Sequence, residues 1–299
     1  MDCYPRANYV VSGIARNCGQ KNHNLLRAIA REGGRSEVYV FCDSDVKPDR
    51  WWLRKLISPL ADEDTPVATG FRWLAPSRGY LGELLHAMLN AYLITLIANR
   101  NFKGVWGGSM AIRREAFEKL GVAERWRETV VDDMSLSQLL VENRVDRVYV
   151  PSCLAVSHEA IPSVRGTIDW FVRQIAYIRY YLKSFWVVAL IAHSLNLLII
   201  LSSPILLIVG AFYRPLLWGG LAGFSFTVLM MLNSLLIKST GRGGWRSLPW
   251  FFFSPLVWSI GAFCLWRTTF LRSLVWRDTI YHMDKGGRVL SVVRKQKAS

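Results

Sequence analysis

The sequence predicts an α/β domain joined to membrane-spanning helices, and two observations support this prediction. The first is the stretch Val38–Cys42, which is β-branched, aromatic or otherwise apolar without a polar break. Such a run is typical of a strand buried inside an α/β sheet. The second is the uneven distribution of apolar residues: most of the surplus lies between Phe185 and Phe270, while residues 1–183 resemble a soluble domain in composition. The 299 residues are enough for a domain of ordinary size and a second part.

The charge and the cysteines narrow the class of protein. The formal net charge is +15, but the chain has no basic helix or aromatic-basic platform typical of a nucleic-acid binder. Attraction to an anionic membrane face and to an anionic substrate fits better beside long apolar runs, so we expect no nucleic-acid partner. The five cysteines are scattered without a Cys-x-x-Cys pair, which indicates reduced packing residues and a cytosolic soluble part. Residues 1–6 are polar, so we expect no signal peptide at this end.

Two carboxylates one residue apart, Asp43 and Asp45, follow the central strand directly. In open α/β sheets, the carboxyl ends of the strands are where ligands bind. Hard oxygen ligands there suit a divalent cation, Mg²⁺ or Mn²⁺, which would neutralise a diphosphate. The alternative is an Asp-rich turn without a ligand, since such turns are common.

The elements around the central strand can be predicted in order. The polar residues 16–24 form a loop, and Gly33-Gly34 ends a helix. Asp49 precedes a short helix that begins near Trp51. The predicted strands and helices up to residue 97 are a strand at Tyr9–Ile14, helices at Leu25–Glu32 and after Asp49, a strand at Val67–Phe71 and a helix at Leu81–Ile97. The last of these carries apolar residues at helical spacing and is expected to lie in the core or to face the membrane.

The second half of the soluble part contains a glycine turn and an acidic pair. Gly107-Gly108 leaves backbone exposed, which suits the close approach of a ligand or, equally, a plain turn before a strand. Asp132 and Asp133 precede a predicted helix at Met134–Asn143. Residues 147–150 and 154–157 are predicted to complete the sheet. The order is α/β throughout.

The chain becomes amphipathic from Thr167 to Ser184, where aromatic and basic residues alternate. This pattern suits a helix lying in the membrane interface. Residues 186–209 and 216–237 are long enough to cross a bilayer. The shorter stretch at residues 249–266 is interrupted by Pro255. The expected division is therefore 1–166 for a cytoplasmic catalytic domain, 167–184 for the interfacial helix, 185–271 for the transmembrane region and 272–299 for a basic cytoplasmic tail.

The positions of the basic residues conflict with an odd number of membrane crossings. The soluble part, the loop at residues 238–246 and the tail are all basic, which places all of them on the cytoplasmic side. Three full crossings would put the tail outside. We therefore expect that residues 249–266 re-enter rather than cross, or that the boundaries hide another crossing.

Three features stand in order along the chain: Asp43-Ser-Asp45, Asp132-Asp133, and Gln174 with Arg179-Tyr180. In this the chain resembles the inverting family 2-type glycosyltransferases of GT-A fold, with their Asp-x-Asp, Glu/Asp-Asp and Gln-x-x-Arg-Trp motifs. It resembles more closely the ceramide glucosyltransferases and their bacterial relatives. The segments that carry this likeness lie between residues 9 and 290: Asn17–Leu25, Cys42–Asp45, Gly107–Met110, the Asp-Asp pair, Ile178–Tyr180, Trp276–Tyr281 and Gly286-Gly287.

The resemblance implies a role for each acidic residue. Asp43 and Asp45 would hold the divalent cation that stabilises the leaving nucleotide diphosphate, with Asp45 as the stronger ligand. Asp133, next to Asp132, would be the base that takes the proton of the acceptor hydroxyl. The alternative for this pair is a helix cap, which is a common role for Asp.

The resemblance also implies substrate contacts. Arg179 would meet phosphate oxygens and Tyr180 would shape the wall of the site, with Gln174 nearby. The alternative is an interfacial helix with arginines that reach toward the headgroups. Lys21 would add a phosphate contact or remain solvated. Trp106, Gly107 and Gly108 are expected beside the lipid substrate.

The chain also departs from the family pattern. Asp132 stands where Glu is frequent, Tyr180 replaces Trp, and Gln174 lies two residues early for the Gln-x-x-Arg-Trp box. Family members carry an N-terminal membrane helix and a first strand, helix and second strand before the region that this chain resembles. The resemblance thus implies an N-terminally incomplete, GT-A-like (Rossmann-like) sheet and a nucleotide pocket without its floor.

These observations predict an integral, multi-pass membrane glycosyltransferase with a cytoplasmic catalytic domain, in the inner membrane if the source is bacterial. It would transfer a hexose, glucose from UDP-glucose, to a membrane lipid hydroxyl such as that of ceramide. The alternatives are another lipid acceptor, such as a hopanoid, diacylglycerol or polyprenyl phosphate, and a non-catalytic membrane remnant. A processive polysaccharide synthase fits less well, because such enzymes have more spans and an intact Gln-x-x-Arg-Trp box.

Overall fold

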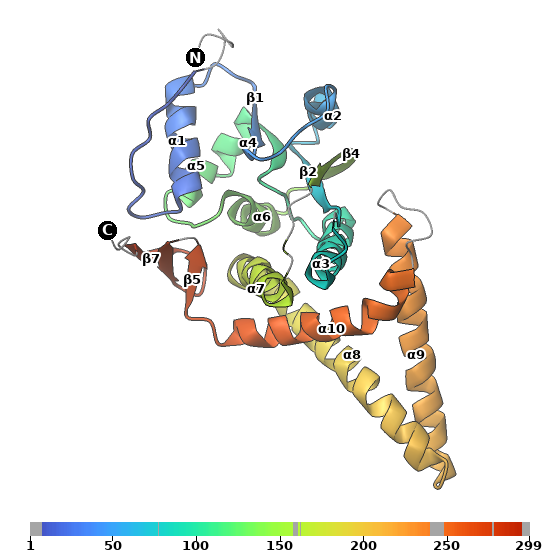
Figure 1. Ribbon diagram of the computed structural model, residues 1–299. Coiled ribbons are helices and arrows are strands. Elements are labelled where there is room, and N and C mark those ends of the chain that lie inside the picture. The colour runs from blue at the N-terminus through green and yellow to red at the C-terminus, as the bar shows by residue number, and fades with distance from the viewer. Residues whose placement is uncertain are drawn as a thin grey trace. The chain divides into compact units, whose positions relative to one another are not determined.

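The computed structural model describes residues 8–76, 78–157, 161, 163–239, 248–276 and 278–294 (Figure 1). The chain divides into two compact units. The first unit comprises residues 1–70, 103–153 and 272–299, and the second comprises residues 71–102 and 154–271. This division differs from the predicted one, because residues 272–299 belong with the first unit and residues 71–102 belong with the second.

The first unit is built on a sheet with the strand order β1-β3-β2-β4. Strand β1 is antiparallel to β3, and β3 is antiparallel to β2. Their bounds are Val38–Cys42 for β1, Val67–Leu74 for β2, Ser109–Arg113 for β3 and Val148–Ser157 for β4. Strand β1 has the predicted bounds, and β4 is one strand where two short ones were predicted. The sheet and helices form the mixed α/β architecture that the sequence predicts.

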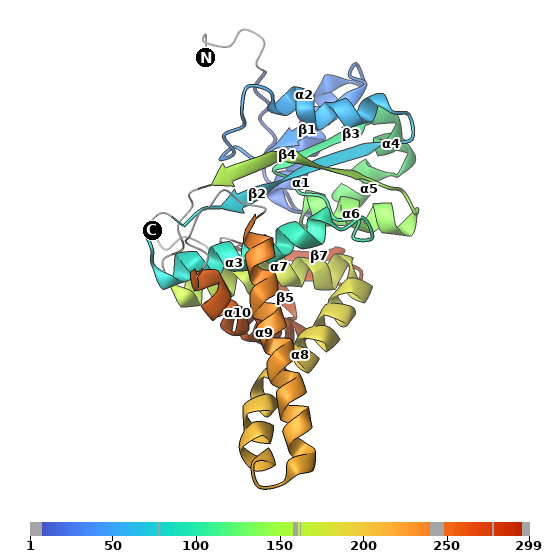
Figure 2. The same cartoon turned by 90° about the vertical axis from the view of Figure 1, so that its right-hand side faces the viewer.

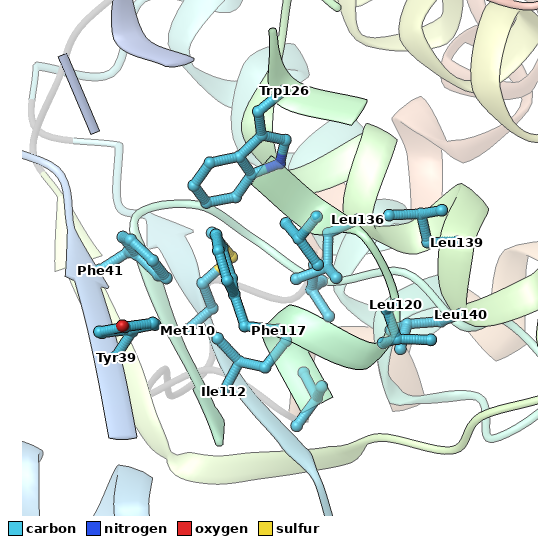
Figure 3. Close-up of a cluster of buried hydrophobic side chains, with 13 residues drawn as sticks. Tyr39, Phe41, Met110, Ile112, Phe117, Leu120, Trp126, Leu136, Leu139 and Leu140 are labelled. Atoms are coloured by element: carbon cyan, nitrogen blue, oxygen red, sulfur yellow. The ribbon is translucent and has the colours of Figure 1, made fainter. Parts of the chain in front are cut away.

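Helices cover both faces of this sheet within the first unit (Figure 2). The side chains of β1 alternate between the faces, as the pleat of a strand requires. Tyr39 and Phe41 join a buried cluster with Trp126 and residues of β3, α4 and α6 (Figure 3). Val38 and Val40 pack in a second cluster with Leu56 and residues of β4 on the opposite face. Both faces of β1 are therefore covered, which is why the strand is apolar throughout.

The remaining helices of the first unit are α1 (Gln20–Glu32), α2 (Trp52–Ile57), the 3₁₀ helix η1 (Ser58–Ala61), α4 (Arg114–Lys119), α5 (Val122–Trp126) and α6 (Asp132–Glu142). Helix α1 starts five residues earlier than predicted. The predicted strand at residues 9–14 is not formed, and Tyr9, Val11 and Ile14 are exposed. Residues predicted to form a basic tail instead form a three-stranded sheet: β5 (Ser273–Trp276), β6 (Thr279–Met283) and β7 (Val289–Arg294).

The second unit is helical, with α3 (Leu81–Ala98), α7 (Val164–Tyr181), α8 (Lys183–Gly210), α9 (Arg214–Ser239) and α10 (Leu248–Thr269). Within the part of the chain that the structure describes, α3, α8, α9 and α10 are long and apolar enough to cross a membrane. Helices α8 and α9 run side by side (Figures 1 and 2), and α9 approaches α8 closely at Gly220 and Gly223. Part of the predicted basic loop, residues 240–246, lies outside the described residues.

Helix α7 was predicted to lie in the membrane interface, and the structure gives its apolar face partners within the protein. Trp170, Phe171 and Ile175 are buried, and α7 packs against α3 and α10 of the same unit. The ring of Trp170 meets that of His86 in α3 edge to face, with centroids 4.2 Å apart. Burial of an amphipathic face against neighbouring helices satisfies the same pattern that a membrane surface would.

Candidate functional site

A lysine at the start of α1 joins three distant segments of the first unit. Lys21 Nζ lies 2.6 Å from Asp43 Oδ1 and 2.9 Å from Asp132 Oδ2. It also donates a hydrogen bond of 3.2 Å to the carbonyl oxygen of Gly107. One ammonium group thus holds together the segment after β1, the glycine turn before β3 and the start of α6. We refer to Lys21, Asp43, Asp132 and Asp133 as the acid–lysine cluster.

The acidic pair lies in the first turn of α6. Asp132 is 3% exposed. Its neighbour Asp133 accepts hydrogen bonds from the backbone N–H of Gly107 at 3.1 Å and from that of Met134 at 2.7 Å. Backbone N–H groups and the helix dipole both favour negative charge at this end of a helix. The N-cap residue of α6 is Val131, without a side-chain cap, so the Asp133 carboxylate instead joins the first turn of α6 to the glycine turn.

The glycine turn fits the acid–lysine cluster only because its residues lack side chains. A Cβ atom on Gly107 would lie 2.3 Å from Asp132 Oδ2 and 2.8 Å from Lys21 Nζ. A Cβ atom on Gly108 would lie 2.2 Å from the indole ring of Trp106. The backbone N–H of Trp106 is held in turn by Thr69 Oγ1 at 3.0 Å. The backbone of Gly107 thus lies against Asp132 on one side of the turn, and the Trp106 indole lies against Gly108 on the other.

The pKa values of the cluster follow from burial and mutual charge. Burial of the Asp133 carboxyl, together with the negative charge of Asp132, raises its pKa to about 6. Burial also raises the pKa of Asp132, and Lys21 opposes this shift. For Lys21 itself, burial alone would lower the pKa, but the charges of Asp132, Asp133 and Asp43 raise it above its ordinary value. The lysine is therefore a permanent cation, and Asp133 is a carboxyl group that titrates close to neutral pH.

The two predicted metal ligands differ in their surroundings. The Asp43 side chain is 31% exposed and bound to Lys21, whereas Asp45 is exposed to solvent. In the described part of the chain, no group of three or more His, Cys, Asp or Glu side chains could hold a metal ion by itself. Mg²⁺ is, however, often held by one or two carboxylates and completed by water and substrate phosphates. The donor set of Asp43 and Asp45 fits a cation of that kind.

The predicted substrate contacts on α7 lie in the second unit. Arg179 Nη1 donates a hydrogen bond of 2.8 Å to the carbonyl oxygen of Leu271, and its guanidinium carbon lies 5.4 Å from the centroid of the Tyr180 ring. Tyr180 is buried, and Gln174 is half-buried. Their assignment to substrate stays a prediction. Within its own unit, Arg179 ties the end of α7 to the chain just after α10.

The structure adds residues that the sequence did not single out. The side-chain amide of Asn22, which is fully buried, donates to the carbonyl oxygen of Thr129 at 3.0 Å. The backbone N–H of Gly19 donates to the same oxygen at 2.9 Å. A Cβ atom on Gly19 would collide with the backbone at Val130. A polar residue inside a short polar segment gives no local signal of such a distant partner.

Comparison with known proteins assigns the family. A family model described as glycosyl transferase family 21 matches residues 1–289. No curated protein matches the chain significantly. The family match includes all members of the acid–lysine cluster, the glycine turn and the helices of the second unit. Since it extends over nearly the whole sequence, the chain belongs to glycosyl transferase family 21.

Proposed function

We propose that this glycosyltransferase transfers a hexose from a nucleotide sugar to the hydroxyl group of a membrane lipid, with inversion at the anomeric carbon. Glucose from UDP-glucose is the expected donor, and ceramide is the expected acceptor. The observation that supports this proposal most is the acid–lysine cluster, in which a carboxyl group with a pKa of about 6 lies beside a glycine turn in a chain of this family.

In the proposed reaction, Asp133 acts as the general base. Its carboxylate takes the proton of the lipid hydroxyl while the hydroxyl oxygen attacks the anomeric carbon of the sugar. The bond between that carbon and the diphosphate oxygen breaks, and the nucleoside diphosphate leaves with the bonding electrons. A base with a pKa near the working pH is suited to this step, because it is ionised yet still basic. Asp133 would hold the transferred proton until it passes to solvent.

Lys21 and the two aspartates after β1 would set the charge around this step. Lys21 supplies one fixed positive charge next to Asp132, so that Asp133 is the carboxyl group left to exchange a proton. Asp43 and Asp45 would hold a divalent cation, Mg²⁺ or Mn²⁺. When bound, such a cation supplies charge neutralisation for the leaving diphosphate.

The base assignment can be tested on the full chain in detergent or nanodiscs. We expect Asp133→Asn to lower the rate of glucose transfer from UDP-glucose to ceramide by about a thousandfold, within the range for loss of a general base. Asp64→Asn is the matched control, because Asp64 is exposed in the turn before β2. Transfer by Asp133→Asn at the wild-type rate would remove the assignment. A panel of hopanoid, diacylglycerol and polyprenyl phosphate acceptors would show whether a different lipid is used.

We also propose that α8 and α9 cross the membrane while α3 and α10 do not. Strand β1 pairs with β3 in one ladder, so the chain before and after α3 lies on the same side of the membrane. Glu128 accepts a backbone hydrogen bond from Val289, so the chain before α7 and after α10 also lies on one side. An even number of crossings must therefore lie between residues 154 and 271.

The burial of the helices favours the α8–α9 pair as these crossings. Within an apolar stretch of 18 residues in each helix, only 6% is buried inside the protein in α8 and in α9, against 44% in α10. The basic residues favour the cytoplasmic side for the first unit. In sealed vesicles with the cytoplasmic face outward, we expect protease to remove a tag placed after residue 299 and to spare one placed in the turn at residues 211–213. Protection of the tail tag would refute this topology.

A further inference from the structure

The three-stranded sheet β5-β6-β7 makes two sets of polar contacts with the rest of the first unit that lie next to the acid–lysine cluster in sequence. One set lies at the beginning of α1, where Lys21 follows Gln20. The other lies at the segment Glu128–Thr129, which comes shortly before Asp132. We refer to β5, β6 and β7 together as the C-terminal sheet. The first set consists of hydrogen bonds, and the second consists of backbone pairing and one ion pair.

At the first contact, the end of β7 holds the residues that lead into α1. Arg294 Nη2 donates hydrogen bonds of 3.0 Å to the carbonyl oxygen of Ala15 and 3.2 Å to Gln20 Oε1. Gln20 Oε1 also accepts the backbone N–H of Ala15 at 3.1 Å. Tyr281 in β6 is 3% exposed. Its burial raises the pKa of the phenol, and the nearby backbone N–H of Gln20 lowers it. Gln20 is thus held through its side chain, and its backbone lies near the Tyr281 phenol.

At the second contact, the start of β7 holds the segment that leads into α6. The backbone N–H of Val289 donates to the carbonyl oxygen of Glu128 at 2.7 Å, and Thr129 forms an antiparallel bridge with Arg288. Arg288 Nε lies 3.2 Å from Glu128 Oε1. The carbonyl oxygen of Thr129 in turn accepts from Gly19. The C-terminal sheet, the start of α1 and the Glu128–Thr129 segment therefore form one closed set of contacts.

We propose that the C-terminal sheet is a positioning element for the acid–lysine cluster, with Arg294 and Tyr281 as its positioning residues. The sheet fixes the residues just before Lys21 and just before Asp132, and so fixes the separation of the two charged groups. This role rests on the proposed function of the cluster in glycosyl transfer. Reacting groups must be held closely, because a misplacement of about 1 Å can lower a rate by about a hundredfold.

The proposal predicts how variants of the two positioning residues behave. Arg294→Gln removes both hydrogen bonds to the α1 entry, while Arg294→Lys keeps the charge and can keep one of them. Tyr281→Phe removes only the phenol oxygen and keeps the buried ring. Lys285→Gln is the matched control, because it removes one charge from the exposed turn between β6 and β7. The full chain in detergent is used for all variants.

Two measurements separate this proposal from the proposed function. Hydrogen–deuterium exchange reports on residues 16–24 and 126–134, and we expect faster exchange in both segments in Arg294→Gln and Tyr281→Phe. For transfer, we expect about a tenfold lower kcat, an unchanged donor KM and partial recovery in Arg294→Lys. Exchange and kcat equal to those of Lys285→Gln in both variants would overturn the positioning role. A wild-type protein without transferase activity would refute the proposed function, while the exchange data would still decide whether the sheet holds the two segments.

Discussion

The two acidic pairs of the first unit are held in different ways. Asp132 and Asp133 lie in the first turn of α6, where Lys21 and the backbone of Gly107 contact them. Asp43 and Asp45 follow the end of β1; Asp43 shares the same lysine, and Asp45 is exposed. The fold thus fixes one pair through contacts to two other segments and leaves the second pair open on one side.

This difference separates two tasks that carboxylates can perform in one site. A buried pair next to a single lysine has its charge set by the protein, so that one of its members titrates near neutral pH. An open pair keeps oxygen atoms available for a ligand that arrives from solvent. The stability of the buried pair should therefore depend on Lys21, and the open pair should be free to bind a cation.

The largest effect on stability is expected for Lys21→Met. The Asp132 side chain is 4% exposed, so the variant would leave a buried carboxylate without its counter-ion. Removing one partner of a buried ion pair is expected to lower the free energy of unfolding by about 3 kcal/mol. Chemical unfolding in detergent measures this change. The double variant Lys21→Met with Asp132→Asn should recover most of the loss; equal instability of the single and double variants would contradict the explanation.

A control for Lys21→Met is available in another ion pair. Lys55 lies 2.8 Å from Asp49, and both side chains are at least one third exposed. Since exposed ion pairs contribute little, Lys55→Met should change the free energy of unfolding by no more than about 1 kcal/mol. A similar loss in both variants would indicate a general effect of the substitution instead of the burial of Asp132.

A smaller loss is expected for Gly107→Ala, which places a methyl group against the same ion pair. The new Cβ atom would lie 2.3 Å from Asp132 Oδ2, so the carboxylate or the turn must move. Such overpacking costs typically about 1–3 kcal/mol. Gly219→Ala is the control, since its Cβ atom would meet Leu206 at an ordinary 3.7 Å. We expect thermal unfolding to separate the two variants, and equal midpoints would show that the turn yields without strain.

The sequence predicted the elements whose signal is local. The apolar run of β1 indicated a strand with both faces covered, and the clusters around Tyr39 and Val38 explain why. Helical spacing of apolar residues predicted α3, and apolar stretches long enough to cross a bilayer predicted α8 and α9. These patterns depend on residues that are close in the chain, so they can be read without knowledge of the partner elements.

The sequence did not predict elements that depend on distant contacts. The first turn of α1 is polar and was predicted as a loop, but Asn22 is held by Thr129. Residues 272–299 were predicted as a tail because they are basic, yet Leu274 and Tyr281 are buried in a sheet. Asp43 and Asp45 were singled out by their place after a buried strand, and the role of Asp132 and Asp133 was predicted by resemblance. The common contact of Asp43 and Asp132 with Lys21 was not predicted, since nothing local links residues so far apart in the chain.

The pH dependence of transfer tests the charge balance of the buried pair. Because the pKa of Asp133 is raised to about 6, the base is lost by protonation below that pH. We expect kcat to fall on the acid side with a midpoint near pH 6. In Asp132→Asn, loss of the neighbouring negative charge should move this midpoint to lower pH, provided that transfer remains measurable. An unchanged midpoint would show that a different group is titrating.

The same raised pKa affects stability with a definite sign. The native state binds a proton at Asp133 over a pH range in which the unfolded chain has already lost it. The stabilisation from this proton is complete below the ordinary Asp pKa and is lost as the pH rises through about 6. Asp133→Asn should therefore flatten the fall in stability between about pH 4 and pH 7, which unfolding at several pH values would detect. An equal slope in the wild type and the variant would contradict the shifted pKa.

The smallest change in stability is expected for Asp45→Asn, and this variant addresses the open pair. Asp45 is exposed, so the substitution should change the free energy of unfolding by less than about 0.5 kcal/mol. Asp43→Asn should have a larger effect, because it weakens the bond of Asp43 to Lys21. If the open pair binds a cation together with a diphosphate, Asp45→Asn should nevertheless weaken the binding of UDP in the presence of Mn²⁺ and leave binding in the presence of EDTA unchanged. Calorimetric titration under both conditions makes this comparison, and equal Mn²⁺-dependent binding in Asp45→Asn and the wild type would leave Asp45 without the role of a ligand.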